Sequence, residues 1–448
     1  MKKKFHLVTI PFALFAFTFG YTVSADDTLE EVVVMGKPIK ASQQSAIEAK
    51  RLADNVADII SADAVGRFPD QNLADALGRI PGMGIERDQG QARYISFRGS
   101  PKRYTTTAFN GIDVPGVENG RIPRFDAYPS VITSQVVANK AITADMPGES
   151  VSGYIDVRTF QPGDVDGFSL SAEVGFGEQD LGGGDVDKAN VRISYSDDSF
   201  GVLVYGSSNG REQVTDNREY EYVGSPGQLV PEQLEYRNYL LNREDEAYGG
   251  TLEFYLENGG RAFISTTNTK FSDTEERNHW YFYFPSGVAA NSGTADLSVR
   301  RLLQDADYSN ETNVNTIGFE SSFNDWDFEV SYSDIETRQT LWLPIIFLNA
   351  KGGDPEITNA SYDVTNGLEP IISFDEDLNA IDFPTRLLID AIGGLDIDND
   401  QFKFDASKQN QWGELKLGFK YDSRDALGGG TPLETQASGL TVTVDEVR

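Results

Sequence analysis

Leu415-Lys416-Leu417-Gly418-Phe419-Lys420-Tyr421 alternates large apolar side chains with charged or small residues at every position. Successive side chains of a β-strand point to opposite faces of the sheet, so this two-residue period places the four large apolar residues on one face. The alternation recurs in five further segments, at 168–176, 191–195, 252–256, 328–332 and 402–407. Residues 166–448 are therefore predicted to form antiparallel sheet with one apolar and one polar face.

The connections between these strands carry a second signal. We predict nine strands, near 168–177, 189–197, 200–209, 246–257, 260–273, 312–324, 327–338, 400–408 and 412–424. Links of two or three residues alternate with long links at 178–188, 210–245, 274–311 and 339–399. In an up-and-down meander every short turn then lies at one end, which is the pattern of outer-membrane barrels. This asymmetry is more specific than the alternation, which a soluble β-sandwich shares.

The N-terminus has the pattern of a secretory signal peptide. Three lysines at 2–4 precede an apolar stretch at 7–19 and a Val23-Ser24-Ala25 cleavage site, so we expect residues 1–25 to be removed. The apolar stretch is shorter than the roughly 20 residues that a membrane-spanning helix needs. No apolar run of that length follows, so we expect either a soluble exported protein or a barrel in the outer membrane.

Composition excludes several classes of function. The net charge is −32, and a chain this acidic is a poor partner for nucleic acid, whose phosphates demand a basic face. The absence of cysteine rules out disulfides, thiolate zinc sites and thiol nucleophiles. His279 is the only histidine outside the signal peptide, so we predict no metal site and no cofactor.

Two zones precede the predicted sheet. Residues 26–49 are mostly polar, with one short apolar segment at 30–36, and are predicted to be an extended tail. Residues 50–163 mix helix and strand signals and are predicted to form a compact α+β domain. Its helices are expected at 49–60 and 72–80, and its strands at 93–98, 105–109, 131–139 and 153–159.

Several motifs in these two zones resemble those of a known family. Glu30-Glu31-Val32-Val33-Val34-Met35-Gly36 resembles a TonB box, the peptide that pairs with the energy-transducing protein TonB. Phe68-Pro69-Asp70-Gln71-Asn72 through Pro81-Gly82 is similar to the start of the plug domain of TonB-dependent receptors of the outer membrane. Further similarity lies at 95–99, 110–111, 134–146 and 153–159. Within the family, the Xanthomonas–Caulobacter-type receptors, many associated with carbohydrate uptake, are the nearest in pattern.

The resemblance implies a fold and a mechanism. An α+β plug domain (50–163) would fill the lumen of an antiparallel transmembrane β-barrel that begins at residue 166. An extracellular small molecule or oligosaccharide would bind from outside, and TonB with its inner-membrane energising complex would pull the N-terminal segment. Such transport needs no covalent chemistry, so the chain is expected to be a non-enzyme with no catalytic residues. Its other partner would be the lipid of the cell outer membrane.

Three groups of site residues follow from the resemblance. The TonB-binding residues would be Glu30, Glu31, Val32, Val33, Val34 and Met35. Arg98, Gly99 and Arg158 would seat the plug, although solvated strand residues are an equal alternative for the two arginines. Substrate-binding candidates are Arg103, Tyr104, Arg121, Arg124, Trp280, Tyr281 and Tyr283. The last three belong to an aromatic run expected in or beside a long loop, where a packed loop or an interfacial girdle is the alternative.

Other interpretations remain open at this point. Receptors of this family have about 22 strands, and nine are predicted here, so we expect the chain to be a fragment of a longer reading frame. A siderophore or metal-chelate receptor is the alternative within the same class. A secreted β-rich adhesion protein is an alternative from another class, and a hydrolase is disfavoured because no paired-acid motif stands out.

Overall fold

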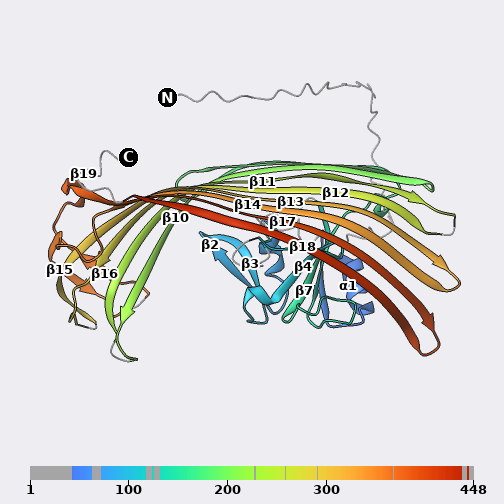
Figure 1. The fold of residues 1–448 in the computed structure, drawn as a ribbon, viewed down its shortest axis with the longest axis horizontal. Coiled ribbons are helices and arrows are strands. Elements are labelled where there is room, and N and C mark those ends of the chain that lie inside the picture. Colours follow the sequence, from blue (N-terminus) through green and yellow to red (C-terminus); the bar gives the residue numbers. More distant parts are fainter. Residues whose placement is uncertain are drawn as a thin grey trace, which may run out of the picture. The chain divides into compact units, whose positions relative to one another are not determined.

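The computed structural model describes residues 43–62, 72–117, 124–125, 132–226, 229–257, 259–289, 291–366, 368–435 and 441–442. The predicted signal peptide and the segment 30–36 lie outside these residues. The remainder contains an α+β domain, made by the described residues between 43 and 164, and a large antiparallel sheet from residue 167 onward. This order confirms the predicted fold class (Figure 1). No helix among the described residues is long and apolar enough to cross a membrane.

The α+β domain is built on a five-stranded sheet in the order β1-β6-β7-β4-β5. Its strands are β1 (Ala57–Ser61), β4 (Thr105–Phe109), β5 (Ile112–Asp113), β6 (Thr133–Asn139) and β7 (Gly153–Thr159). A separate hairpin joins β2 (Met83–Asp88) to β3 (Gln91–Phe97), and the helices are α1 (Gln43–Leu52) and α3 (Leu73–Leu77). Short 3-10 turns lie at Lys102–Tyr104 and Pro162–Asp164.

Local sequence explains the ends of these elements. The side chain of Asn72 accepts a hydrogen bond of 3.2 Å from the amide of Asp75 and so caps α3. Asn110 and Gly111 have φ angles of 52° and 76°, which makes them the two-residue turn between β4 and β5. The core of the domain contains fully buried apolar side chains from α3, from the hairpin and from the five-stranded sheet, including Leu73, Phe97 and Ile155.

One predicted helix of this domain is wrong in its second half. The helix expected at 49–60 ends at Leu52, and Ile59 and Ile60 instead lie in β1, opposite Val137 and Val136 of β6. β-Branched side chains pack well on a pleated surface, and tertiary pairing with β6 outweighs the helical spacing of apolar residues. The hairpin strand β2 was not predicted.

The large sheet is a meander of nine strands, each antiparallel to the next along the chain. The first five are β8 (Gly167–Glu178), β9 (Asp185–Ser196), β10 (Phe200–Val223), β11 (Val230–Tyr255) and β12 (Arg261–Tyr283). The others are β13 (Ser292–Phe323), β14 (Trp326–Leu348), β17 (Phe383–Asn410) and β18 (Gly413–Thr435). Among the described residues, the meander thus has the nine strands that were predicted, and three shorter strands join the same sheet outside it.

The meander strands from β10 onward are much longer than predicted, at 23 to 32 residues each. Much of the loops expected at 210–245, 274–311 and 339–399 is therefore strand. Both faces of these extensions carry polar residues, so apolar alternation disappears while main-chain pairing continues. The short turns are where they were expected, and Asn324 and Asp325 form one of them with φ angles of 50° and 63°.

Three short strands, two from the link between β14 and β17 and one after β18, form a small additional layer. β15 (Ile357–Asp363) pairs with the start of β13 and with β16 (Ile371–Ser373), and β19 (Thr441–Val442) pairs with the start of β17. Buried side chains of this layer, including Ile357 and Tyr362, pack with Leu297, Val299 and Phe282 into a second core. The far ends of the long strands are thereby held together.

Candidate functional site

The large sheet has two different faces, and one of them carries a continuous apolar row. Register places one residue of each of the nine strands side by side, and all nine are apolar or tyrosine: Phe168, Tyr195, Val202, Leu252, Ile264, Ile317, Tyr332, Phe402 and Tyr421. Every member except the half-buried Val202 is exposed, with Phe168 at 68%. We call this the outer row, and its face the outer face. Large exposed apolar surfaces mark contact with lipid or with another protein.

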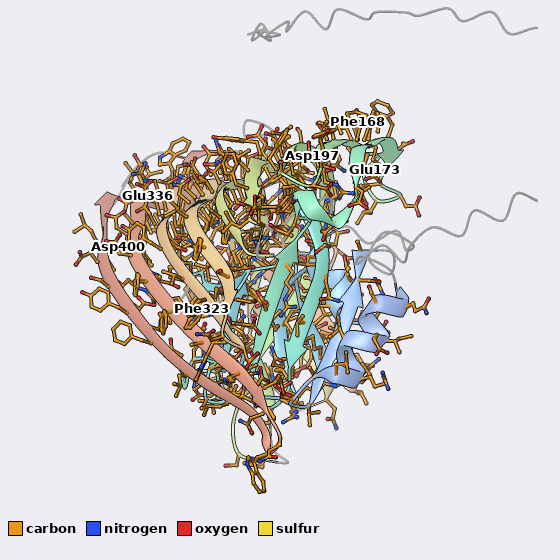
Figure 2. The ribbon with its side chains drawn as sticks, turned by 90° about the vertical axis from the view of Figure 1, so that its right-hand side faces the viewer. Phe168, Glu173, Asp197, Phe323, Glu336 and Asp400 are labelled. Atoms are coloured by element: carbon orange, nitrogen blue, oxygen red, sulfur yellow. The ribbon has the colours of Figure 1, made fainter. Side chains whose placement is uncertain are left out.

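The apolar zone of the outer face is bounded. On β14 the outward residues Trp326, Phe328, Val330 and Tyr332 are followed by Asp334 and Glu336. Asp334 lies opposite Asp400 of β17, and Figure 2 shows Asp400 on the side of the sheet turned away from the α+β domain. The segment 326–332 spans about 20 Å at roughly 3.3 Å per residue. On a strand tilted by about 40°, this length covers roughly 15 Å of the apolar band of about 25 Å that membrane barrels have.

The opposite, inner face contacts the α+β domain through a buried arginine. Nη1 of Arg243 on β11 donates to Oε1 of Gln91 at 2.7 Å, and Nε donates to Oδ2 of Asp273 on β12 at 3.0 Å. A further Arg243 nitrogen donates to the side chain of Gln89. Arg243 is 3% exposed and Asp273 is 1% exposed. The arginine therefore links two strands of the sheet to the turn of the β2–β3 hairpin.

The same turn is held from β10. Thr215 donates from its hydroxyl to the main-chain oxygen of Gln89 at 3.0 Å, and Nε2 of Gln213 donates to that oxygen at 2.5 Å. Gln89 and Gly90 both have positive φ angles, of 48° and 84°, as a tight two-residue turn requires. Side chains of β10 and β11 thus both bind the turn at Gln89 and Gly90, which we call the clamped turn.

A second contact joins β5 to the strands at the other side of the sheet. The side chain of Gln401 on β17 accepts from the amide of Asp113 at 3.2 Å and donates to its carbonyl oxygen at 2.6 Å. Lys420 of β18 forms an ion pair with the Asp113 carboxylate. Burial raises the pKa of Asp113 above its ordinary value, although the attraction of Lys420 acts in the opposite direction.

Cation–ring and apolar contacts fill the space between these polar links. The Arg124 guanidinium lies 4.1 Å from the ring centre of Phe271 on β12, and that of Arg192 on β9 lies 3.3 Å from the ring centre of Phe160. Leu203 and Tyr205 of β10 are part of the apolar core of the α+β domain. The domain is therefore packed against the inner face from β9 to β18.

The structure distributes the predicted site residues unevenly. Glu30, Glu31, Val32, Val33, Val34, Met35 and Arg121 lie outside the described residues. Arg103 and Tyr104 are exposed and contact each other. Arg124 is buried, and it is the one substrate-binding candidate of this domain that meets the sheet in a described contact.

The residues predicted to seat the plug do not meet the sheet in the described part of the chain. Arg98 and Gly99 are exposed at φ angles of 53° and 73°, and Arg158 pairs with Asp156 of its own strand at 2.9 Å. The cations that join the two parts belong to the sheet instead: Arg243 donates to Gln91 and Lys420 pairs with Asp113, both of the α+β domain. Sequence inspection missed these residues, although inward charged positions within alternating segments are a usable signal.

The aromatic run 280–284 lies mostly in strand β12, which ends at Tyr283, so it lies directly beside the link to β13 rather than inside a loop. Trp280 points to the outer face and packs edge-on against Phe383, with ring centres 5.8 Å apart. Tyr281 and Tyr283 point to the inner face and stack at 6.2 Å with an angle of 5° between their planes. Among the described residues, no group of three or more histidine, aspartate or glutamate side chains is placed to hold a metal ion.

Charged and aromatic residues surround this inner tyrosine pair. His279 lies edge-on to Tyr239 at 5.1 Å. Arg237 pairs with Glu235, and Arg277 pairs with Glu275 and donates to the Tyr308 hydroxyl at 3.1 Å. The arginine charges are thus balanced by carboxylates, and the surface combines aromatic faces with polar groups.

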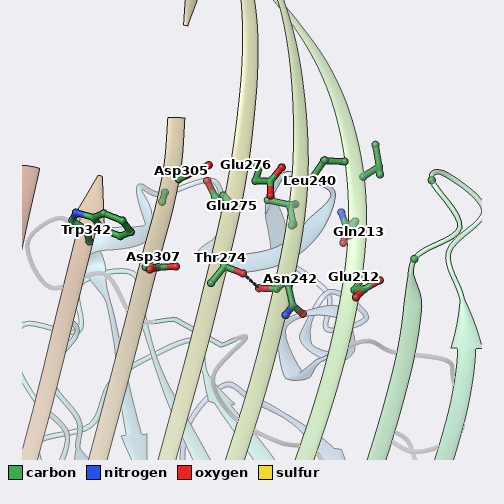
Figure 3. A pocket seen from close by; sticks show the side chains of 15 residues that line it. Glu212, Gln213, Leu240, Asn242, Thr274, Glu275, Glu276, Asp305, Asp307 and Trp342 are labelled. Atoms are coloured by element: carbon green, nitrogen blue, oxygen red, sulfur yellow. Dashed lines mark hydrogen bonds between the residues drawn. The ribbon is translucent and has the colours of Figure 1, made fainter. Parts of the chain in front are cut away.

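A pocket of about 480 Å³ lies on the outer face instead (Figure 3). Its lining includes a cross-strand row of Glu212, Asn242, Thr274, Asp307 and Trp342 from β10 to β14. The hydroxyl of Thr274 donates to the carbonyl oxygen of Asn242 at 3.4 Å. Since these residues face away from the α+β domain, this pocket is separate from the inner surface.

Comparison with known proteins gives one family match and a set of solved structures at low identity. Residues 49–154 match the model of the TonB-dependent receptor plug domain. The ferric citrate transporter FecA in its unliganded form is 12% identical with a TM-score of 0.36, over 85% of this chain and 60% of that chain. The siderophore receptor PirA from Acinetobacter baumannii is 10% identical with a TM-score of 0.33, over 86% of this chain and 78% of that chain.

The copper transporter OprC is 11% identical with a TM-score of 0.34, over 86% of this chain and 62% of that chain. No curated protein matches the sequence. The chain spans 60% of the length of FecA. The family match identifies residues 49–154 as a TonB-dependent receptor plug domain.

Proposed function

We propose that this chain serves TonB-dependent active transport across the outer membrane, with an oligosaccharide as the substrate. The observation that carries the proposal is the division of one antiparallel sheet into two faces. The outer face presents the apolar row from Phe168 to Tyr421, and the inner face holds the plug domain. A sheet with both faces sealed against protein would not need the outer row.

The outer row suits the hydrocarbon of a membrane. In lipid every main-chain polar group must be paired, and the antiparallel ladder supplies that pairing between strands. The apolar zone ends at Asp334 and Asp400, whose charges suit water beyond the membrane surface. These features support a location in the outer membrane.

The plug domain supports active rather than passive transport. Buried contacts at Arg243 and Gln401 hold it against the inner face, so work is needed to move it. The segment 30–36, with its resemblance to a TonB box, is proposed to receive that work through main-chain pairing with TonB.

Charge favours a neutral substrate over an anionic chelate. The chain carries a net charge of −32, which repels anions in general. On the inner face Arg237 and Arg277 are balanced by Glu235 and Glu275, beside the stacked pair of Tyr281 and Tyr283. Aromatic faces and neutralised ion pairs suit sugar rings and hydroxyl groups. An oligosaccharide of the kind associated with Xanthomonas–Caulobacter-type receptors fits this chemistry.

A ferric siderophore or another metal chelate is the second candidate substrate. Arg300 occupies an inner position beside Tyr281 and Tyr283, and no carboxylate among the described residues forms an ion pair with it, so its charge favours this candidate. Substrate uptake discriminates between the two.

The test uses cells that make the protein in its native host background. Uptake of radiolabelled maltotetraose, xylotetraose, cellotetraose and laminaritetraose is compared with uptake of ferric enterobactin and ferric citrate. The proposal expects uptake of a tetrasaccharide that disappears both without TonB and on deletion of residues 30–36. Uptake of a ferric compound alone would establish the second candidate. A protein recovered in the medium rather than in outer membranes would support a secreted adhesion protein and end the transport proposal.

A further inference from the structure

Three polar side chains on the inner face are buried without a hydrogen-bond partner among the described residues. They are Asn310 of β13, Thr337 of β14 and Asn399 of β17, at 6%, 3% and 2% exposure. Both amide atoms of each asparagine and the hydroxyl of the threonine are unpaired. Buried polar groups in folded proteins are nearly always paired, so three on one face require an explanation.

The three residues form a diagonal line across neighbouring strands. Thr337 lies opposite Thr312 of β13, two residues from Asn310, and opposite Ile397 of β17, two residues from Asn399. Because residues two apart in a strand share a face, all three side chains point to the same side as Gln401. We call this set the amide line.

The plug contacts the sheet at both ends of the amide line. At one end, Gln401 lies two residues beyond Asn399 and bonds to the main chain of Asp113. At the other end, Phe271 is the cross-strand partner of Asn310 and lies under the guanidinium of Arg124. The amide line therefore belongs to the boundary between plug and sheet.

The two halves of that boundary differ in chemistry. On the side of β10 to β12, the side chains of Arg243, Gln213 and Thr215 donate hydrogen bonds to the clamped turn. Across β13 to β17, the amide line has unused donors and acceptors and carries no charge. An asparagine amide both donates and accepts, and so does a threonine hydroxyl. Hydroxyl groups of a neutral solute have the same dual character, so they complement the amide line better than a charged chelate does.

We infer that Asn310, Thr337 and Asn399 bind the hydroxyl groups of a neutral saccharide as it passes between the plug and the sheet. This inference rests on the proposed function and adds the route to it: the clamped turn stays fixed to β10–β12 while the plug separates from β13–β17. Unpaired groups on the route exchange one neutral partner for the next without a tightly held intermediate. Passage then needs no fixed charge on the wall.

Cysteine labelling tests the inference, because the chain has no cysteine of its own. Asn310→Cys, Thr337→Cys and Asn399→Cys are each made in the full protein and treated in cells with a small charged methanethiosulfonate reagent. Asn315→Cys is the matched control, since Asn315 lies on the same strand as Asn310 but is exposed on the outer face. Heat-modifiable migration on gels confirms that each variant is folded in the outer membrane.

We expect the three amide-line cysteines to react only when TonB is present, and the Asn315→Cys control to react in all cells. The tetrasaccharide that the unaltered protein takes up should slow labelling of the amide line by about tenfold at a concentration near ten times its dissociation constant. The control should keep its rate.

Other outcomes separate the two proposals. No labelling of the amide line in cells that take up the sugar would place the route elsewhere and overturn the inference alone. If the amide-line cysteines react but the sugar does not slow their labelling, the amide line contacts water and not the sugar. This result would also overturn the inference. If the unaltered protein takes up none of the tetrasaccharides, the proposed function itself fails.

Discussion

Arg243 of β11 and Gln91 of β3 are joined by a hydrogen bond of 2.7 Å between Nη1 and Oε1, although they lie 152 positions apart in the chain. The same guanidinium bonds to Asp273, so a single buried cation links plug and sheet. A buried charge pair contributes little over a well-packed apolar pair, but losing one partner leaves the other uncompensated. The link therefore makes plug seating sensitive to one residue.

Arg243→Met is expected to destabilise the seated plug. The substitution leaves the Asp273 carboxylate buried without its cation, which costs about 3–5 kcal/mol. The measurement is limited proteolysis of the protein in outer membranes, together with the urea midpoint of the purified protein in detergent. Cleavage within the plug should speed up, and the midpoint should fall.

The matched control for this variant is Arg338→Met. Arg338 pairs with Asp396 at 2.6 Å, but both side chains are exposed on the outer face, so the expected change is at most about 1 kcal/mol. Adding Asp273→Asn to Arg243→Met should recover part of the stability. Equal effects of Arg243→Met and Arg338→Met would show that the buried link does not hold the plug.

Asp58 predicts a pH dependence within the plug. Burial alone would raise the pKa of its carboxyl group, but hydrogen bonds from Lys140 and Lys50 outweigh burial and lower this pKa. A carboxyl group with a lowered pKa stabilises the fold above its unfolded pKa of about 3.9, and that contribution is lost as pH falls through the folded pKa. Asp58→Asn should therefore destabilise β1 at pH 7 but not at strongly acidic pH.

Hydrogen exchange of the amides in 57–61 and 133–139 measures this effect, because β1 pairs with β6 over these residues. Faster exchange in Asp58→Asn is expected at pH 7, and the difference from the unaltered protein should vanish below the lowered pKa. Glu48→Gln is the control, since Glu48 and its partner Arg51 are both exposed on α1. A difference that persists unchanged into acid would contradict the ion-pair account.

The outer row predicts where a charge is tolerated. Phe319 is 43% exposed on the outer face of β13, within the apolar zone, and Asn315 lies four residues away on the same face in the polar zone. Phe319→Lys should cost about 2–4 kcal/mol in a membrane, whereas Asn315→Lys should cost about 0–1 kcal/mol. The yield of heat-modifiable protein in outer membranes measures both. Similar yields would argue against lipid contact at Phe319.

The sequence predicted the order of domains and the number of strands because alternation survives where one face is apolar. Leu415 to Tyr421 and Phe328 to Tyr332 lie in the apolar zone, so their period is visible. The predicted ends of the strands are wrong from β10 onward. In the extensions of these strands the inner face carries charged residues such as Glu219 and Glu221, and the outer face carries both polar and apolar residues. Main-chain pairing continues there without a pattern in hydrophobicity.

The contacts of the site were harder to predict than the fold. Arg98 and Arg158 are predicted to seat the plug because they belong to plug-like motifs; their side chains are exposed among the described residues, and the seating role stays a prediction. Arg243 and Gln401 act across 152 and 288 positions of sequence, and no local pattern records such a partner. Trp280 and Tyr281 were grouped as one run, whereas the strand period sends them to opposite faces.

Gly249 of β11 should tolerate no side chain, because the side chain of Tyr205, its cross-strand partner on β10, occupies the space beside it. A Cβ atom there would lie 2.2 Å from the carbonyl oxygen of Thr266 and 2.5 Å from the hydroxyl oxygen of Tyr205. Tyr205 belongs to the plug core and donates to Thr267 at 2.9 Å, so it cannot move freely. Gly249→Ala is expected to destabilise the protein by about 1–3 kcal/mol, as overpacking does.

The thermal midpoint in detergent and protease resistance of the plug measure this change together. Gly175→Ala is the control, since a Cβ there would make only an ordinary contact of 3.5 Å with Lys188 on the neighbouring strand. Gly175→Ala should leave both quantities unchanged. Gly249→Ala should lower the midpoint and make the plug easier to cleave, because displacement of Tyr205 loosens the packing of both the sheet and the plug. A stable Gly249→Ala protein with a protected plug would mean that Tyr205 does not couple the sheet to the plug.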